Sequence, residues 1–432
     1  MNGFIPKDLV VVKNIFSSLR SRNYRFYFAG QGISLIGTWM QNVALSWLVY
    51  RLTGSLFLLG FIGFTSQIPT FVLGPFAGVL TDRYNRLKLM MLTQVLFMLQ
   101  ALAMTLLVLF NVVAVWHIIA LSLVFGIITA FDAPARQSLV INLINDPNDL
   151  GNAIALNSAL FNGARLIGPA IAGITIAVVG EGICFLLNTV SFLAVIFALS
   201  QVHITLKRAT AHKSDFTKSF IEGFYYTFQS MPIRTLIILL AILSLFGFPF
   251  IVLLPAYAKE IMHGNADTFG FLMSALGAGA LTGALIMAAR KTVLGLGRII
   301  SLNTFILGLA VVLASFSKEM YFSLPVFYFG GLSMILALAS INTMLQTIAD
   351  EDKRGRVMSF YAMALMGTTP IGNLLAGIVA SGFGIPLTIL IGGIITVLSG
   401  VWFQLNRGSF RQYVRTIYIN KGILPEIPNE MN

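Results

Sequence analysis

The sequence predicts an all-α polytopic membrane protein with twelve transmembrane helices in two six-helix pseudo-symmetric halves. Three observations lead to this fold class: apolar stretches of spanning length, a one-sided distribution of positive charge, and an internal repeat. Hydrophobic residues make up 57% and charged residues only 10% of the 432 residues, whereas a soluble protein carries about 25% charge. A stretch of about 20 apolar residues spans a bilayer as a helix.

Twelve such spans can be drawn along the chain. In order, they are expected at residues 26–50, 56–80, 89–111, 113–135, 153–179, 182–201, 235–258, 268–289, 296–316, 322–348, 357–380 and 385–406. Only a few residues near Asn111 separate the third span from the fourth, so their hairpin is expected to be tight.

Positive charge supports this count of spans. With the N-terminus inside, 24 of the 28 Lys and Arg residues fall in the inner segments, and only Arg51, Lys259 and Lys318 fall outside. Cytoplasmic loops carry such an excess, so we expect both termini in the cytoplasm and the chain in the cytoplasmic (inner) membrane. The same rule accounts for the net charge of +12 without a nucleic-acid partner.

The internal repeat centres on the stretch GARLIGPAIAG in the fifth span. Its three glycines recur 204 residues later, in GTTPIGNLLAG of the eleventh span. The six positions are Gly163, Gly168 and Gly173, and Gly367, Gly372 and Gly377. Glycine lets two membrane helices lie backbone to backbone. Pro169 removes a backbone donor and is expected to bend the helix.

A second, weaker copy supports the same division of the chain. Glycines 74 and 78 of the second span correspond to glycines 279 and 283 of the eighth span, at an offset of 205. Four units are therefore expected: 1–201, an N-terminal half; 202–234, a linker; 235–406, a C-terminal half; and 407–432, a cytoplasmic tail. Within the linker, the aromatic spacing of residues 216–231 predicts an amphipathic surface helix, either a plain tie or a regulatory element.

The loop after the second span carries a recognisable motif, GVLTDRYNRLKLM. Four of its residues match the pattern G-x-x-x-D-R-x-G-R-[KR]: Gly78, Asp82, Arg83 and Arg86. The chain here resembles the major facilitator superfamily, whose halves are related by a parallel repeat. Asn85 stands in place of the glycine, and Leu87 in place of the last basic residue.

The resemblance implies that this loop is a gate. Asp82 is expected to accept hydrogen bonds from the N-terminus of the eleventh span, while Arg86 holds Asp82 in place. Asp132 matches the helix-four acid with which the motif pairs. It is the only acid well inside the predicted spans, and such an acid is costly unless paired or facing water. Asp132 is therefore also the candidate for proton coupling. The alternative is a basic anchoring loop without a gating role.

The glycine stretch of the fifth span resembles a helix-five motif associated with antiporters and exporters, which implies efflux. Gly168, Pro169 and Gly173 match that motif, whereas Ala164 and Ala172 replace expected glycines. Three longer segments, at residues 132–140, 152–173 and 354–372, are similar to the branch containing the enterobactin exporter and related siderophore or drug efflux proteins.

Polar residues inside the spans are the substrate-site candidates. Arg165, near the middle of the fifth span, costs at least about 2.5–3.5 kcal/mol there. It is expected either to face the central cavity and attract an anionic or phenolic substrate, or to clamp helix carbonyls. By resemblance, spans one, four, seven and ten line the cavity, and the amide candidates are Gln41, Asn42, Asn342 and Gln346. Interhelical hydrogen bonding is the alternative role for these amides.

The leading hypothesis is a monomeric secondary active exporter of small amphipathic molecules, working by alternating access with proton antiport. An importer and a non-transporting membrane sensor are the alternatives. The chain shows no catalytic constellation, cofactor motif, metal cluster or nucleotide-binding loop, so an enzyme is not expected. Its expected partners are the small-molecule substrate, the lipid bilayer and the proton gradient.

Overall fold

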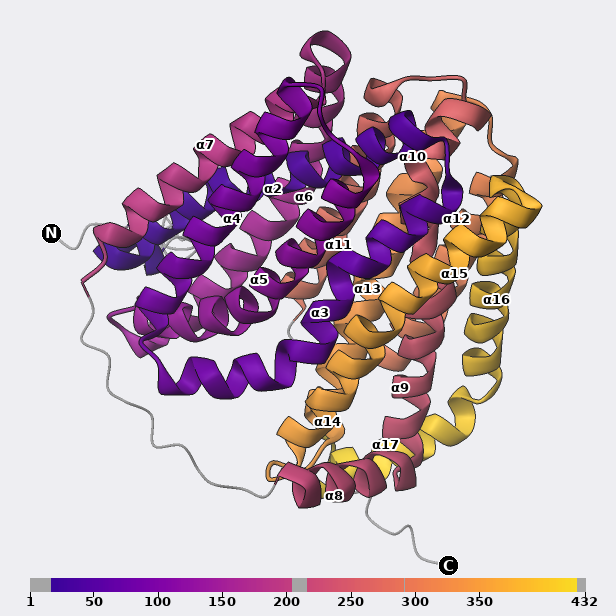
Figure 1. The fold of residues 1–432 in the computed structure, drawn as a ribbon. Coiled ribbons are helices and arrows are strands. Elements are labelled where there is room, and N and C mark those ends of the chain that lie inside the picture. The colour runs from indigo at the N-terminus through magenta and orange to yellow at the C-terminus, as the bar shows by residue number, and fades with distance from the viewer. Residues whose placement is uncertain (1–16, 204–215, 291, 426–432) are drawn as a thin grey trace, which may run out of the picture.

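The computed structural model describes residues 17–203, 216–290 and 292–425, excluding a few side chains inside these ranges. Every described regular element is helical, and two bundles stand side by side (Figure 1). The first bundle contains α2 (Arg22–Thr53), α3 (Leu56–Arg83), α4 (Arg86–Leu109), α5 (Val115–Asn142), α6 (Leu150–Val179) and α7 (Glu181–Ser200).

The second bundle begins at Met231, a few residues before the expected start of the seventh span. Its helices are α9 (Met231–Ile242), α10 (Leu254–Ala256), α11 (Ala266–Ala289), α12 (Leu296–Phe316), α13 (Met320–Ile348), α14 (Arg354–Ala362), α15 (Thr368–Phe383) and α16 (Ile385–Leu405). α9 and α10 belong to one continuous crossing at residues 231–261, and α14 and α15 belong to another at residues 354–383.

Twelve long crossings result, in agreement with the prediction. Eleven of them are apolar enough to be recognised as membrane spans by composition among the described residues. The twelfth is α2, which is 32 residues long but carries Gln31, Gln41 and Asn42. It can be polar because it packs between α6 and α7, with Gln31 and Gln41 buried.

The seventh and eleventh crossings are interrupted helices. After α9, a π-helical turn (Leu243–Gly247) and a 3-10 turn (Pro249–Leu253) precede α10, and a second π-helical turn follows at Tyr257–Ile261. Proline lacks the donor that a regular helix needs, and Pro249 and Pro255 lie in this stretch. α6, in contrast, runs through Pro169 as one helix.

The repeated glycines join the two bundles in equivalent ways. A Cβ atom at Gly173 of α6 would lie 3.0 Å from the Cα of Gly270 in α11. Its counterpart, Gly377 of α15, would bring a Cβ to 2.9 Å from the Cα of Gly60 in α3. Each half therefore contributes one glycine of the repeat to a contact in which backbones touch directly.

The middle glycines of the repeat face inside their own bundle. Gly168 packs on α2, where an added Cβ would lie 3.0 Å from the carbonyl oxygen of Ile36. Gly372 packs on the seventh crossing, 2.6 Å from the carbonyl oxygen of Leu245. The first and seventh crossings are equivalent in a six-plus-six repeat, so the predicted symmetry is present in the contacts.

The second, weaker glycine copy does not make equivalent contacts. In α11, a Cβ at Gly283 would lie 2.9 Å from the carbonyl oxygen of Leu332 in α13. In α3, no atom lies within 4 Å of the position of a Cβ at Gly74 or Gly78. The repeat in sequence is therefore not a repeat in packing here, because Gly74 and Gly78 lie on a face of α3 that no neighbour approaches, although Ala77 between them is buried.

The two ends of the bundles differ. We call the end where α2 begins, α3 ends and α8 (Phe216–Gln229) lies the basic end, and the other the opposite end. Figure 1 shows the bundles approaching one another towards the opposite end, near α10, and spreading apart towards the basic end. The inter-bundle glycine contacts at Gly60 and Gly173 fall in the half of the helices nearest the opposite end.

The predicted amphipathic linker helix is present as α8, and it does more than lie on a surface. Arg356, in the first turns of α14, forms an ion pair of 2.8 Å with Glu222. The ring of Phe228 lies 6.2 Å from that of Phe360, and the Asp350 backbone N–H donates to the Tyr226 hydroxyl at 3.1 Å. α8 is therefore docked on the α13–α14 connection, and burial raises the pKa of Tyr226.

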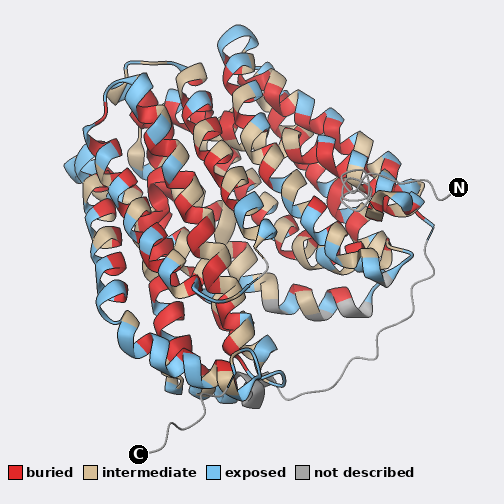
Figure 2. Ribbon diagram, turned by 180° about the vertical axis from the view of Figure 1, so that it is seen from behind, coloured by how far each residue is buried: buried red, intermediate tan, exposed pale blue. Residues whose placement is uncertain are grey.

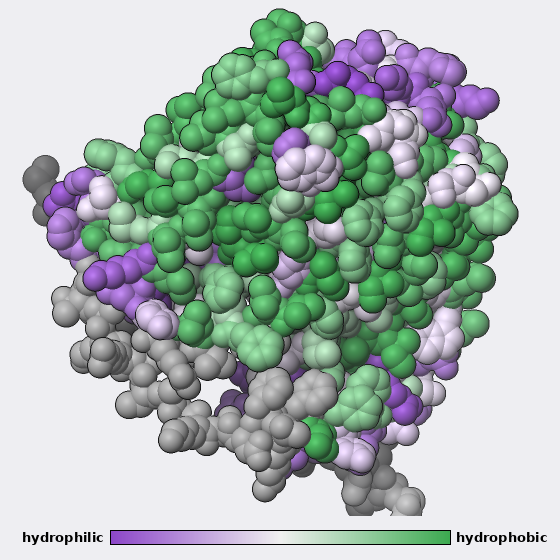
Figure 3. All heavy atoms as spheres, viewed as in Figure 1, coloured by the Kyte–Doolittle hydropathy of each residue, from purple (hydrophilic) through white to green (hydrophobic). Residues whose placement is uncertain are grey.

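The outer surface is suited to lipid. Large apolar side chains are exposed along the helices, among them Phe76, Val178 and Leu405. Figure 2 shows buried residues on the inner faces of the helices, and Figure 3 shows one face that is mostly hydrophobic, with hydrophilic side chains gathered towards the ends. A contiguous exposed apolar surface of this extent is typical of a membrane protein.

Candidate transport cavity and gates

A cavity of about 470 Å³ lies between the two bundles. Its walls come from α2, α3, α4 and α5 of the first bundle and from the seventh crossing, α11 and the eleventh crossing of the second. Sites for small molecules have volumes of about 300–1,000 Å³ and often lie at the interface between domains. Because both bundles contribute walls, any rocking of one against the other changes the shape of this cavity.

The two walls differ in chemistry. The first bundle contributes most of the uncharged polar side chains, among them Gln41, Asn42, Gln67 and Gln100, together with apolar ones such as Trp39, Leu45 and Phe125. The second contributes mainly apolar ones, including Phe248, Ile251, Phe269 and Met273. No Asp, Glu, Lys or Arg is among the described residues that line the cavity, and no potential metal-binding cluster occurs in the described part of the chain. The cavity thus suits an amphipathic molecule.

Gln41 lines the cavity, but both polar atoms of its side-chain amide are hydrogen-bonded within the first bundle. Its nitrogen donates to the Gln100 side-chain oxygen at 3.0 Å, and its oxygen accepts from the Asn188 side chain at 2.7 Å. These bonds join α2, α4 and α7 inside the first bundle. Gln41 therefore has the alternative role, hydrogen bonding between helices. Gln100 also lines the cavity, and it was not among the candidates expected from the sequence.

The other three amide candidates separate into two groups. Asn42 lines the cavity, and no hydrogen bond to its side chain occurs within the described residues. Asn342 and Gln346, in contrast, do not line this cavity. Their side chains bond to one another at 2.6 Å on α13, and Gln346 faces a separate groove with Asp350 and Lys421. The expectation that these two residues contact the central cavity is corrected here, because they lie near the end of α13.

Arg165 lies beside the cavity wall. Its guanidinium carbon is 5.6 Å from the centre of the Trp39 ring, and Trp39 lines the cavity. Its buried Nε has no hydrogen-bond partner, and within the described residues Arg165 has no carboxylate partner and no bond to a helix carbonyl. Among the described residues, no contact supports the carbonyl-clamp alternative, and the contact made by the charge is with the indole ring.

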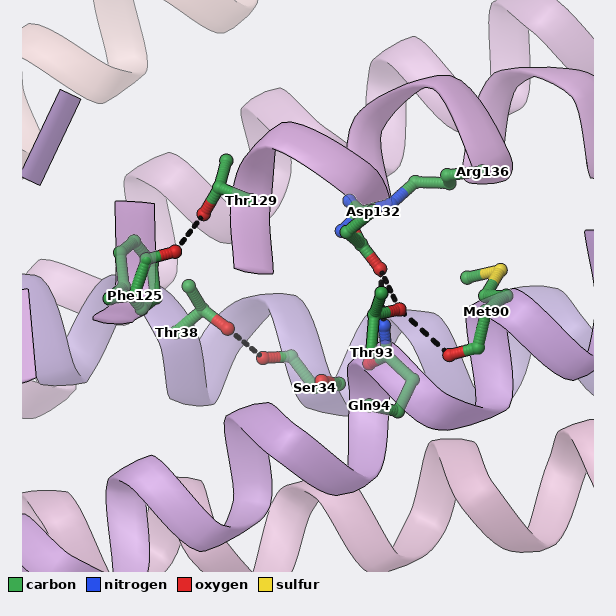
Figure 4. A network of polar contacts seen from close by, with 9 residues as sticks. All are labelled: Ser34, Thr38, Met90, Thr93, Gln94, Phe125, Thr129, Asp132 and Arg136. Carbon is green, nitrogen blue, oxygen red and sulfur yellow. Dashed lines mark hydrogen bonds and ion pairs between the residues drawn. The ribbon is translucent and has the colours of Figure 1, made fainter. Parts of the chain in front are cut away.

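Asp132 is the centre of a buried polar network on α5 (Figure 4). Its Oδ1 accepts hydrogen bonds from Thr93 at 2.8 Å and from Gln94 at 2.7 Å, both on α4. Its Oδ2 pairs with Arg136, one turn along the same helix. The i,i+4 spacing brings these two side chains together, and the expected pairing of Asp132 with the motif loop stays a prediction.

The motif loop is described only in part. Gly78, Asp82 and Arg83 belong to the last turns of α3, but the side chains of Asp82 and Arg83 lie outside the described residues. Asn85 caps α4, its side chain accepting from the Leu87 backbone N–H at 3.0 Å. The expected bonds of Asp82 to the eleventh crossing therefore remain a prediction.

At the opposite end, a set of aromatic and charged side chains links the bundles. The Tyr50 hydroxyl of α2 donates to the Glu260 carboxylate of the seventh crossing. The Lys259 ammonium lies 6.0 Å from the centre of the Trp47 ring, which stacks on Phe269 of α11 at 6.4 Å. Nothing in the sequence pointed to this contact, since its members are 210 or more residues apart.

Replacing Tyr50 with phenylalanine is expected to weaken closure at the opposite end by about 1 kcal/mol, because one hydrogen bond is lost and the ring is kept. The measurement is the distance between spin labels placed on α2 and the seventh crossing near this end. More open distances than in the parent protein are expected. An unchanged distance distribution would show that the Tyr50–Glu260 bond does not hold the bundles together.

Two related helical bundles with an amphipathic cavity between them are the plan of many membrane transporters. In such proteins, inverted or parallel repeats surround a binding site near the middle of the membrane. The chain belongs to the transmembrane secretion effector family of the major facilitator superfamily, whose profile matches residues 13–411. It is accordingly a transporter of small molecules and not an enzyme.

The proteins to which the chain is similar in sequence are also named as transporters or efflux proteins. The chain is 25% identical over 385 residues to the staphyloferrin A transporter of Staphylococcus aureus, covering 89% of this chain and 96% of that protein. It is 25% identical to the multidrug efflux pump Tap of Mycolicibacterium fortuitum, covering 86% and 91%, and 21% identical to macrolide efflux protein A of Streptococcus pyogenes, covering 86% and 93%.

Solved structures agree in fold. A bacterial homologue of the iron transporter ferroportin, in an inward-facing state, superposes with a TM-score of 0.68 at 18% identity and covers 88% of this chain and 98% of that one. A bacterial homologue of the lysosomal transporter Spinster, inward-facing and unoccupied, gives a TM-score of 0.65 at 14% identity, covering 92% and 97%.

Proposed function

We propose that the protein is a secondary active exporter that moves small amphipathic, siderophore-like or drug-like molecules out of the cell by alternating access with proton antiport. The observation that carries this proposal is the uncharged cavity of about 470 Å³ between the bundles, in which polar side chains, mostly from the first bundle, lie among apolar side chains from both. Such walls solvate both parts of an amphipathic molecule, whereas a small ionic solute would leave the apolar wall unmatched.

The proposed orientation places the basic end in the cytoplasm. The excess of Lys and Arg at this end supports it. In this orientation the bundles approach one another on the outer side, at Gly173 and Tyr50, and spread apart on the inner side. An exporter in this state is ready to load from the cytoplasm, and the motif loop at residues 78–88 is proposed to close that side after loading.

Arg165 supplies a proposed specificity element. A cation next to Trp39, with no carboxylate partner in the described part of the chain, favours a substrate that carries an anionic or phenolic group. The substrate would approach Trp39 with this group, and the apolar wall formed by Phe248 and Met273 would accept the rest of the molecule.

Asp132 is the proposed coupling residue. In this state its carboxylate is bonded to Thr93, Gln94 and Arg136. Proton exchange at Asp132 is proposed to accompany a rearrangement in which Arg136 moves away. Antiport needs such a link, because the proton then binds in one conformation and leaves in the other.

Arg165→Gln is expected to lower transport of an anionic substrate by about tenfold or more while leaving a neutral amphipathic substrate unaffected, because a charged hydrogen bond is lost. Arg165→Lys keeps the charge and is the matched control. The measurement is efflux of a carboxylate siderophore and of a macrolide from cells that lack their own pumps, with the amount of folded protein determined in parallel. Equal loss of both activities together with loss of folded protein would instead support a structural clamp.

The same cells distinguish the importer alternative. An exporter lowers the accumulated substrate when a proton gradient is present, and dissipating the gradient restores accumulation. Accumulation above that of cells without the protein would identify an importer. If the purified protein moves neither substrate into nor out of proteoliposomes, the result would match a non-transporting sensor.

A further inference from the structure

The amphipathic helix α17 (Arg407–Asn420) crosses the basic end of the second bundle directly after α16 (Figure 1). From the sequence, this segment was expected only as part of a cytoplasmic tail. Phe410, Val414 and Tyr418, spaced by four residues, are buried against the bundle. Lys421 then donates to the carbonyl oxygens of Thr347 at 2.9 Å and Ala349 at 2.5 Å, at the end of α13. α17 is thus held in place at both ends.

A groove of about 570 Å³ runs between α17 and the first turn of α12. Four guanidinium groups line it, three on α17 at a spacing of four residues and one on α12: Arg407, Arg411, Arg415 and Arg298. No Asp or Glu is among its described lining residues. Within the described residues, none of the four arginines has a carboxylate partner, and Arg407 bonds only to the amide oxygen of Gln404 at 3.2 Å.

Two further features of this groove favour an anion. The N-terminus of α12, at Leu296, opens on the groove, and its cap residue Gly295 offers no side chain to the first N–H groups. Helix N-termini attract phosphate and other anions. Independently, Tyr418 lines the groove and is 3% exposed, and its hydroxyl has no hydrogen-bond partner. A buried hydroxyl without a partner costs free energy that a bound acceptor would recover.

The remaining lining is apolar, contributed by Val293, Leu294, Phe410, Val414 and Leu424. An inorganic phosphate ion gains nothing from contact with an apolar surface, whereas the acyl chains of a phospholipid can pack against it. Basic pockets between helices at the cytoplasmic face of membrane proteins bind anionic headgroups in this way. We propose that the α12–α17 groove binds an anionic phospholipid, with its phosphate between the four arginines and the Tyr418 hydroxyl and its chains along the apolar wall.

Bound lipid would then join α17 to α12, two elements that otherwise meet mainly through Phe410, whose ring lies 3.7 Å from a Cβ placed at Gly297. This proposal does not depend on the direction or substrate of transport. Its expected consequence is that the second bundle is more stable in membranes or detergent containing phosphatidylglycerol than in phosphatidylcholine, because a ligand stabilises the state that binds it.

The test is titration of the purified full chain in detergent with phosphatidylglycerol or phosphatidylcholine, read by native mass spectrometry of lipid adducts and by the melting temperature. The double variant Arg411→Gln/Arg415→Gln is expected to bind phosphatidylglycerol at least about tenfold more weakly. Tyr418→Phe, which keeps the ring and the packing, is expected to weaken binding by about fivefold. The control Arg22→Gln/Arg25→Gln removes the same charge at the same end and is expected to bind as the parent protein does.

Four results would overturn the proposal. Equal loss of binding in the control would mean that the lipid follows the general positive charge of this end. Competition by millimolar inorganic phosphate would identify a site for a free anion. Tighter lipid binding by a chain that ends at Pro425 would identify the acidic segment 426–432 as the native occupant. Unchanged binding in both the double variant and Tyr418→Phe would remove the groove as the site.

Discussion

Replacing Gly173 with alanine is expected to destabilise the protein and reduce transport by between about 5-fold and 150-fold, because the added methyl group would separate the bundles. Its Cβ would lie 2.9 Å from the carbonyl oxygen of Ala266 and 3.0 Å from the Cα of Gly270. Backbone atoms cannot move aside as a side chain can, and overpacking of this kind costs about 1–3 kcal/mol. The measurements are substrate efflux and the melting temperature of the purified protein.

Gly163→Ala is the matched control, since it lies on the same helix and no atom is within 4 Å of its Cβ position. There the substitution is expected to stabilise by up to about 1 kcal/mol, because alanine has the higher helix propensity. The two variants thus have opposite predicted signs. Equal melting temperatures for both would show that the contact between Gly173 and Gly270 does not hold the halves together.

Replacing Asp132 with asparagine is expected to cost about 3–5 kcal/mol of stability, because Arg136 then remains buried without its carboxylate partner. The side chain of Asp132 is only 3% exposed and that of Arg136 is 24% exposed, so water cannot fully replace the lost charge. The first measurement is the yield of folded protein, for which a sharp reduction is expected.

The double variant Asp132→Asn/Arg136→Gln separates stability from coupling. It removes both charges, and is expected to recover most of the folded protein while efflux no longer follows an imposed pH gradient. Efflux that still responds to the gradient in this variant would show that the coupling proton binds elsewhere, and Asp132 would then be a structural residue. A double variant as unstable as Asp132→Asn would show that Thr93 and Gln94 also require the carboxylate.

Several parts of the fold could be predicted from the sequence because they depend on local properties of the chain. Span length located the helices to within four residues, except that the fourth runs to Asn142, seven residues beyond its expected end. The glycine repeat anticipated that α6 and α15 occupy equivalent places, since glycine at a helix contact leaves a recognisable pattern. α2 shows what composition cannot predict. Its amide side chains make it less apolar than the other crossings, and only their hydrogen bonds to α4 and α7 explain why they are tolerated inside the bundle.

The candidate site was harder to predict. Gln41 and Asn42 were expected at the cavity and lie there, but Asn342 and Gln346 do not, because a position along a helix does not specify its distance from the bundle centre. The ion pair of Asp132 with Arg136, within its own helix, was not among the contacts expected from the sequence. The Tyr50–Glu260 bond and the α12–α17 groove were not foreseen, since their members come from distant parts of the chain.

By itself, the sequence determined the class of the protein: a twelve-helix transporter with two related halves, a basic end and a family-typical motif loop. These properties follow from apolar length, charge placement and small-residue spacing, each of which is local. Only the tertiary structure decided which polar groups meet, that Arg165 lies against the ring of Trp39, and which end of the bundles is in contact. Those outcomes depend on helix rotation and tilt, which are set by the packing of all neighbours together.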